Sequence, residues 1–72
     1  MKHKIIIKRV ENRLYIRDID LKELKPLLSL ANITVHETDT GKYTGVPRHY
    51  IHMNTGIRFI LSLTSDYIIE IV

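Results

Sequence analysis

The chain has 72 residues, a formal net charge of +3 at pH 7 and no cysteine. This length allows one small domain, which buries only about 60% of the surface of its unfolded chain and is marginally stable. The lack of cysteine excludes a disulfide framework and a thiolate metal site, and it is typical of a reducing compartment. No apolar run approaches the ~18 residues of a membrane span, so we expect a soluble, cytoplasmic protein without a membrane partner.

The positive charge is concentrated in the first part of the chain. Residues 1–17 contain six basic side chains against Glu11 alone, whereas residues 18–72 contain five basic and seven acidic side chains. This distribution predicts a cationic module attached to a mildly acidic body.

Residues 1–19 are predicted to form a β-hairpin with its bend at Glu11 and Asn12, because asparagine tolerates the left-handed backbone of a tight turn. Pairing Val10 with Arg13 gives one apolar face, made of Ile5, Ile7, Leu14 and Ile16. The opposite face then carries basic residues and one aromatic ring: Lys4, Ile6, Lys8, Tyr15 and Arg17. A shift of one residue would mix the two sets, so this register is preferred.

Residues 20–31 are predicted to form a helix that begins at Asp20. Asp20 is expected to cap the first turn, with Glu23 reaching back to it and Ile19 packing on Leu24. Pro26 lacks an amide proton and disfavours helix at the preceding residue. Two alternatives therefore stay open, a helix kinked there or a short turn followed by a second helix from Pro26.

Residues 33–38 are predicted to form a strand, and three further strands are predicted after it. They cover residues 49–53, 57–63 and 67–72, joined by loops at 54–56 and 64–66. The central one is predicted from the two-residue spacing of Ile57, Phe59, Leu61 and Leu63, which would put all four on the core side. Residues 39–48 contain two glycines and a proline and are predicted to form a long loop, which is more often functional than a short connection.

These elements predict an α+β fold made of a single antiparallel sheet of five to six strands, in the order ββαββββ, with one helix packed on one face. The whole chain, residues 1–72, forms one domain. Either residues 4–9 or residues 67–72 are expected to form an unpaired edge strand.

Neither a metal site, nor a cofactor, nor an enzyme is predicted. Three histidines, His36, His49 and His52, invite a metal hypothesis, but His49 and His52 point to opposite faces of a strand and have no carboxylate or cysteine at a ligand spacing. Arg48, His49 and Tyr50 resemble the kind of hydrolytic cluster found in small ribonucleases, but such trios arise by chance in a chain with four histidines.

The basic face of the hairpin is a candidate site for nucleic acid. Lys4, Lys8 and Arg17 supply phosphate contacts, and Tyr15 supplies a ring on which a base can stack. Lys42, Tyr43 and Arg48 in the long loop are expected to extend this surface. The alternative is a solvated strand face whose lysines guard against aggregation.

A non-enzymatic protein that occludes a partner's surface is the function favoured by a small margin, with nucleic-acid binding as the alternative. The chain begins with methionine and ends in a predicted strand, as we expect of a complete short reading frame. Viruses and mobile elements encode small inhibitors in reading frames of this kind. The outward apolar and aromatic side chains are predicted to be Ile6, Tyr15, Tyr43, Tyr50, Ile60 and Ile68. Ile60 and Ile68 are expected to form a patch on adjacent strands. A homodimer is expected to form through this outer face or through the free edge of the sheet.

Overall fold

The computed structural model describes residues 2–38 and 47–72 of the chain, and these residues form five strands and two helices. In chain order the elements are β1 (His3–Val10), β2 (Arg13–Ile16), α1 (Asp18–Leu30), β3 (His36–Glu37), β4 (His49–His52), α3 (Met53–Ser62), the 3-10 turn η1 (Leu63–Ser65) and β5 (Tyr67–Ile71). The α+β class with one sheet is confirmed. The described residues have the element order ββαββαβ, so the predicted order with a single helix is wrong.

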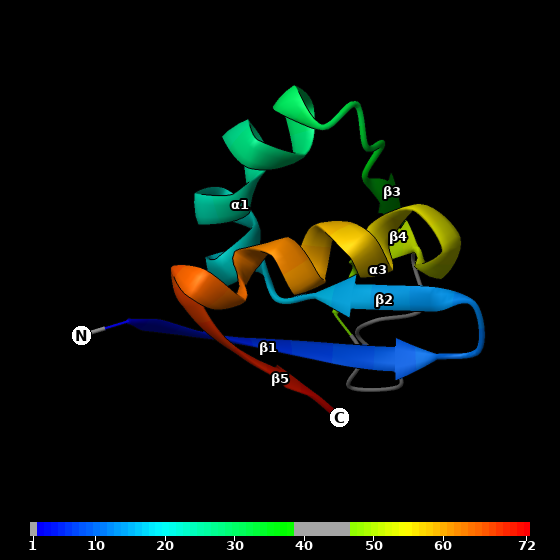
Figure 1. The fold of residues 1–72 in the computed structure, drawn as a ribbon. Coiled ribbons are helices and arrows are strands. Elements are labelled where there is room, and N and C mark those ends of the chain that lie inside the picture. Colours follow the sequence, from blue (N-terminus) through cyan, green and yellow to red (C-terminus); the bar gives the residue numbers. More distant parts are fainter. Residues whose placement is uncertain (1, 39–46) are drawn as a thin grey trace.

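The sheet has the strand order β3-β4-β2-β1-β5, with β3 and β5 at its two edges (Figure 1). All neighbouring strands are antiparallel except β1 and β5, which run parallel. A wholly antiparallel sheet was predicted, and the difference follows from α3. This helix carries the chain from β4 to the far edge of the sheet, as a crossover between parallel strands requires.

The N-terminal hairpin has the predicted register. Val10 pairs with Arg13, and the apolar face made of Ile5, Ile7, Leu14 and Ile16 is completely buried. The left-handed residue at the bend is Glu11, with φ of 54°. The side chains of the opposite face are thereby directed away from the core.

Residues 57–63 do not form the predicted strand, because α3 occupies most of this segment. The buried residues of this region are Gly56, Ile60 and Leu63, which follow helical spacing, while Leu61 is exposed. Residues 54–56 belong to the first turns of the helix rather than to a hairpin loop. A Cβ at Gly56 would lie 2.5 Å from Ile51 Cδ1, so the lack of a side chain there lets α3 pass close over the sheet.

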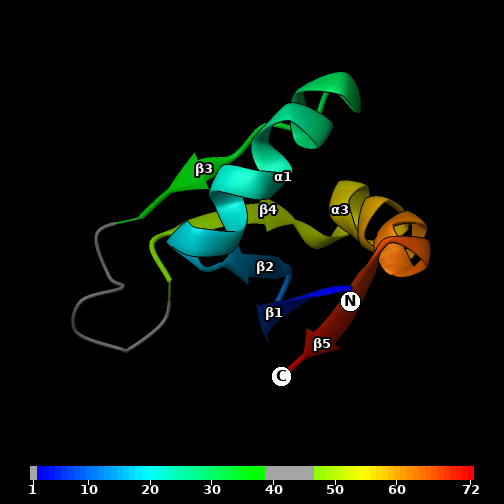
Figure 2. The ribbon, with the colours of Figure 1, turned by 90° about the vertical axis from the view of Figure 1, so that its left-hand side faces the viewer.

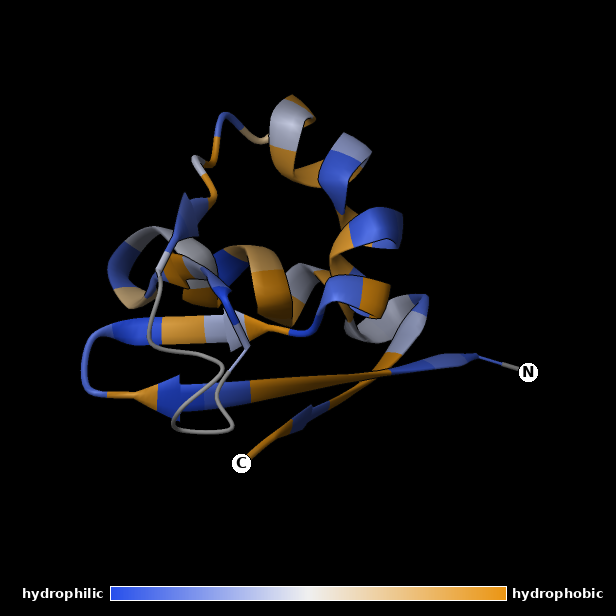
Figure 3. Ribbon diagram, turned by 180° about the vertical axis from the view of Figure 1, so that it is seen from behind, coloured by the Kyte–Doolittle hydropathy of each residue, from blue (hydrophilic) through white to orange (hydrophobic). Residues whose placement is uncertain are grey.

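Both helices pack on the same face of the sheet (Figures 1 and 2). The core is formed by the buried residues Ile5, Ile7, Leu14, Ile16, Leu24, Leu28, Ile51, Ile60 and Leu63. Apolar stretches run along β1, β5 and both helices in Figure 3. No helix of the described residues covers the other side of the sheet, which we call the open face.

The predicted strand over residues 33–38 is shorter than expected, since only His36 and Glu37 pair with β4. Ile33 and Val35 pack against the core, while His36 lies on the open face opposite Tyr50. Most of the predicted loop lies outside the described residues.

The start of α1 differs from the prediction. The helix begins at Asp18, and the flanking Arg17 makes no side-chain capping bond. Asp20 is fully buried instead of capping the helix, and Ile19 is exposed instead of packing on Leu24. Pro26 lies inside one helix, so the alternative of two helices is wrong.

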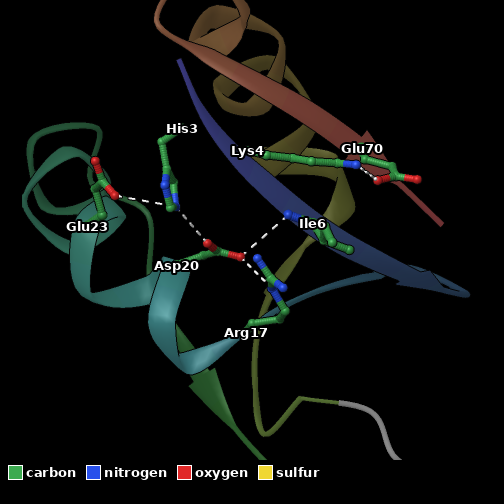
Figure 4. A network of polar contacts seen from close by, with 7 residues as sticks. All are labelled: His3, Lys4, Ile6, Arg17, Asp20, Glu23 and Glu70. Atoms are coloured by element: carbon green, nitrogen blue, oxygen red, sulfur yellow. Dashed lines mark hydrogen bonds and ion pairs between the residues drawn. The ribbon is translucent and has the colours of Figure 1, made fainter. Parts of the chain in front are cut away.

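The Asp20 carboxylate joins α1 to β1 (Figure 4). Its Oδ2 accepts hydrogen bonds from Arg17 Nε at 2.7 Å and from the Ile6 amide at 3.4 Å, and its Oδ1 lies 3.1 Å from His3 Nε2. The described pairing of β1 with β2 begins only at Ile7, so Asp20 supplies Ile6 with an acceptor where β2 does not reach. Burial by itself raises the pKa of Asp20, but the bonds from Arg17, His3 and Ile6 outweigh it and lower the pKa below its ordinary value of 3.8.

Replacing Asp20→Asn should lower the free energy of unfolding by about 2–4 kcal/mol at neutral pH, because the buried amide cannot replace the charged hydrogen bonds. Since the pKa of Asp20 is depressed in the folded protein, this stabilisation is present above the ordinary value of 3.8 and is lost as the pH falls through the lower pKa of the folded protein. Urea unfolding from pH 7 to pH 3 measures both effects. Asp18→Asn, at an exposed carboxylate on the same helix, is the control and should cost less than about 1 kcal/mol. Equal stability of wild type and Asp20→Asn at pH 7 would contradict this role.

Replacing Ile60→Ala should lower the free energy of unfolding by about 2–5 kcal/mol, because it opens a cavity in the core beneath α3. Ile68→Ala, at a half-exposed position of β5, should change it by less than about 1 kcal/mol. Chemical denaturation of both variants tests the helical assignment of residues 53–62. Similar small effects at both positions would indicate that Ile60 lies on an outer strand face after all.

Candidate functional site

The open face carries a row of aromatic and basic side chains across four strands. The register places Lys8 opposite Tyr15, Tyr15 opposite Tyr50, and Tyr50 opposite His36. In the neighbouring register position Arg13 lies opposite His52. Because directly opposed residues share one face of a sheet, strands from both halves of the chain contribute to this row.

Tyr50 is at the centre of the row. Its ring centre lies 5.3 Å from that of Tyr15 and 5.2 Å from that of His36, which is stacked nearly parallel to it at 23°. The His52 ring lies 4.6 Å from His36 and 6.0 Å from Tyr50, edge-on to both. These distances are typical of favourable aromatic pairs.

Arg13 joins the aromatic side chains to a positive charge. Its guanidinium carbon lies 4.4 Å from the centre of the Tyr50 ring, and its Nη1 donates a hydrogen bond of 3.2 Å to Tyr15 Oη. The hydrogen bond with Tyr15, together with the electrostatic interaction with Tyr50, raises the pKa of Arg13. A guanidinium has five N–H donors, so the bond to Tyr15 leaves others with which to contact an anion.

The rings differ in their accessibility. Tyr15 is only 5% exposed, so it supports Arg13 and Tyr50 and does not offer its own ring for stacking. Tyr50 and His36 are half-buried, and His52 is exposed. The surface available to a ligand is therefore formed by Tyr50, His36 and His52 together with Arg13.

The predicted basic residues do not all gather on this face. Lys8 lies there, beside Tyr15, and Lys4 lies on the same face, where it is bound to Glu70 by an ion pair of 2.8 Å. The prediction that Arg17 lies on this face is wrong, because its guanidinium donates a hydrogen bond to the buried Asp20 at the start of α1. The guanidinium of Arg48 lies 3.5 Å from Glu37 Oε1. The predicted Lys42 and Tyr43 lie outside the described residues.

The predicted self-association patch is not formed. Ile60 is 1% exposed in the core, so its placement on the outer face is wrong, for the reason that α3 replaces the expected strand. Ile68 is 52% exposed and lies on β5 opposite Lys4. A single outward isoleucine is ordinary for a protein surface.

His49 and His52 lie on opposite faces of β4, as predicted from their spacing. His49 faces the helical side, where its Nδ1 lies 3.0 Å from Asp18 Oδ1, while His52 faces the open side. Within residues 2–38 and 47–72, no group of three His, Cys, Asp or Glu side chains is arranged to hold a metal ion. His49 and Tyr50, two of the three residues considered above as a chance trio, are consecutive in β4 and point to opposite faces.

Two cavities adjoin α3. The larger, about 580 Å³, lies between the C-terminal end of α1 and α3 and is lined by Ala31, Asn32, Ile33, Asn54, Thr55, Arg58, Phe59 and Ser62. The other, about 280 Å³, includes His36 and His52 among its lining residues. The second cavity therefore continues the surface of the open face towards the start of α3.

Sequence reasoning missed Arg13, His36 and His52 as parts of the site. Arg13 precedes Tyr15 by two residues and His52 follows Tyr50 by two, so strand periodicity alone places each pair on one face. The sequence does not show that β4 lies beside β2, and only this neighbourhood brings the two pairs together.

No protein-family model, curated protein or solved structure matches this chain. No helix among the described residues has the length and apolar character needed to cross a membrane. The function must therefore be inferred from the open face itself.

Proposed function

We propose that the protein is a non-enzymatic, cytoplasmic module that binds single-stranded nucleic acid across the open face of its sheet. The observation that carries the proposal is the position of Arg13, a cation held between Tyr50 and Tyr15 on a face that no described helix covers. Basic groups beside aromatic rings on a sheet are the combination with which single-strand binders contact phosphates and bases.

The phosphate contacts are assigned to Arg13 and Lys8. Both lie on the open face, Lys8 beside Tyr15 and Arg13 over Tyr50. Lys4 is a weaker candidate because Glu70 neutralises it. The net charge of +3 adds a general attraction to polyanions.

The base contacts are assigned to the outer surfaces of Tyr50, His36 and His52. Stacking of a base on an aromatic side chain contributes about 1–3 kcal/mol and tolerates every base. We therefore expect weak sequence preference. Binding to single strands should be tighter than binding to a duplex, whose bases are already stacked.

A protein partner is the second candidate, favoured by the exposed apolar side chains of β5, Ile68 and Ile71. This candidate was preferred on sequence grounds for the outward apolar and aromatic side chains as a set, in which Ile60 and Ile68 were expected to form the self-association patch. The burial of Ile60 removes half of that patch, whereas the rings and Arg13 strengthen the case for nucleic acid. No binding of any nucleic acid at low salt would leave a protein partner as the function.

The double variant Lys8→Gln, Arg13→Gln should weaken binding and flatten its dependence on salt. Each phosphate contact with a single strand contributes about 0.7 to the slope of log K against log salt concentration, so the slope should fall by about 1.4. Fluorescence anisotropy of labelled single- and double-stranded DNA and RNA at several salt concentrations measures this. The matched control is Lys22→Gln, Lys25→Gln, which makes the same charge change on exposed positions of α1. Equal weakening by both double variants would show attraction by net charge alone and would reject the open face as the site.

Tyr50→Leu should weaken binding about tenfold or more while leaving the salt slope unchanged, because it removes a stacking surface but no charge. The same anisotropy titration measures both quantities. Tyr67→Leu removes a tyrosine ring from β5, on the helical side of the sheet, and should bind like wild type. Unchanged affinity of Tyr50→Leu would exclude stacking on this ring.

A further inference from the structure

The outer edge of β5 has no strand beside it among the described residues. β5 is the last strand of the sheet, at the edge beyond β1 (Figures 1 and 2). It contains neither lysine nor proline, the residues that commonly protect an edge from pairing. Its one charge, Glu70, is already bound to Lys4 of β1 (Figure 4).

Apolar side chains are exposed along this same edge. Ile68 is 52%, Ile71 44% and Val72 60% exposed. An unprotected edge with exposed isoleucine and valine is a template for pairing with another strand.

The backbone groups that point outward can be identified. The Val72 amide donates to the Ile7 carbonyl, and the Val72 carbonyl accepts from the Arg9 amide, so both groups of Val72 face β1. In a strand paired on one side, alternate residues direct both backbone groups to the same side. Glu70 and Ile68 therefore also face β1, while Tyr67, Ile69 and Ile71 direct their amides and carbonyls outward.

We propose that two copies of the chain pair through β5 in antiparallel orientation, about a two-fold axis that passes between the two Ile69 residues. In this register the outward groups of Ile69 pair with those of its copy, and the outward groups of Tyr67 pair with those of Ile71. On the helical side every directly opposed pair is then apolar or aromatic.

The two carboxylates of this segment distinguish this register from its neighbours. Centring the pair on Ile69 puts Glu70 opposite Ile68 of the second copy, and Asp66 opposite Val72. Centring it on Ile68 would oppose Glu70 to Asp66, and centring it on Glu70 would oppose the two Glu70 carboxylates. Like charges directly opposed destabilise a pair, so the charges favour Ile69 at the centre.

The consequence for the open face follows from the symmetry. A two-fold axis perpendicular to the sheet keeps both open faces on one side, so two copies form one continuous surface. This joint surface would bind a longer single strand than one copy does. That part of the inference rests on the proposed function, whereas the dimer does not.

The test uses opposite charges at one exposed position. In the proposed register, residue 68 lies opposite Glu70 of the second copy, so Ile68→Lys should keep the dimer and Ile68→Glu should dissociate about tenfold more readily than Ile68→Lys. Sedimentation equilibrium of wild type and both variants over a wide concentration range measures the dissociation constants. The expected effect on folding is the opposite, because residue 68 lies beside Lys4 of its own chain. Glutamate there is stabilised by Lys4 and lysine is repelled, so a loss of folding cannot account for a weaker dimer in Ile68→Glu.

Two sedimentation outcomes would overturn the dimer. A wild type that is monomeric at every concentration would leave the edge to a strand of another protein. If Ile68→Lys and Ile68→Glu weaken the dimer equally, the dimer uses another surface or register.

Nucleic-acid titration of the Ile68→Glu monomer separates the dimer from the proposed function. Loss of affinity for a long strand, with short-strand affinity retained, would support the joint surface. Wild-type affinity for long strands would overturn the joint surface and leave the proposed function intact. A wild-type dimer that binds no nucleic acid would overturn the proposed function and leave the dimer intact.

Discussion

The buried carboxylate of Asp20 is the contact on which the arrangement of the sheet and α1 depends. Burying a charge costs several kcal/mol unless hydrogen bonds and an opposite charge compensate for it. Here the compensation comes from Arg17 beside the helix and from His3 and Ile6 on β1. The part of β1 that β2 does not reach is therefore fixed against α1. With α1 held there and α3 packed on the same side, the other side of the sheet is left open.

The hairpin could be predicted from the sequence because two independent patterns agree on it. The alternation of Ile5, Ile7, Leu14 and Ile16 defines a core face, and this register puts Lys4, Lys8 and Tyr15 on the other side. Residues 57–63 were wrongly predicted as a strand from their apolar spacing and from the loops expected at 54–56 and 64–66. Their apolar spacing fits both a strand and a helix, and the decisive residue is Gly56, whose missing side chain admits Ile51. That contact lies between segments whose proximity the sequence does not show.

The candidate site was harder to predict than the fold for the same reason. Lys8 and Tyr15 lie in one hairpin, so their shared face follows from a local register. Tyr50 and His36 join them only because β4 lies between β2 and β3, which is a property of the whole topology. Arg17 was misplaced because helix α1 begins directly after it, and its guanidinium turns to Asp20.

The arrangement of the open face before any ligand binds has a consequence for recognition. Tyr50 is already in contact with Arg13 and His36, and Arg13 is held by its bond to Tyr15. Side chains fixed in this way lose little conformational entropy when a ligand binds, which favours affinity. The same contacts occupy part of the ring surface, so fewer faces are free for bases. Affinity should therefore depend more on the remaining donors of Arg13 and on Lys8 than on stacking, and recognition should follow the phosphate backbone more than the base sequence.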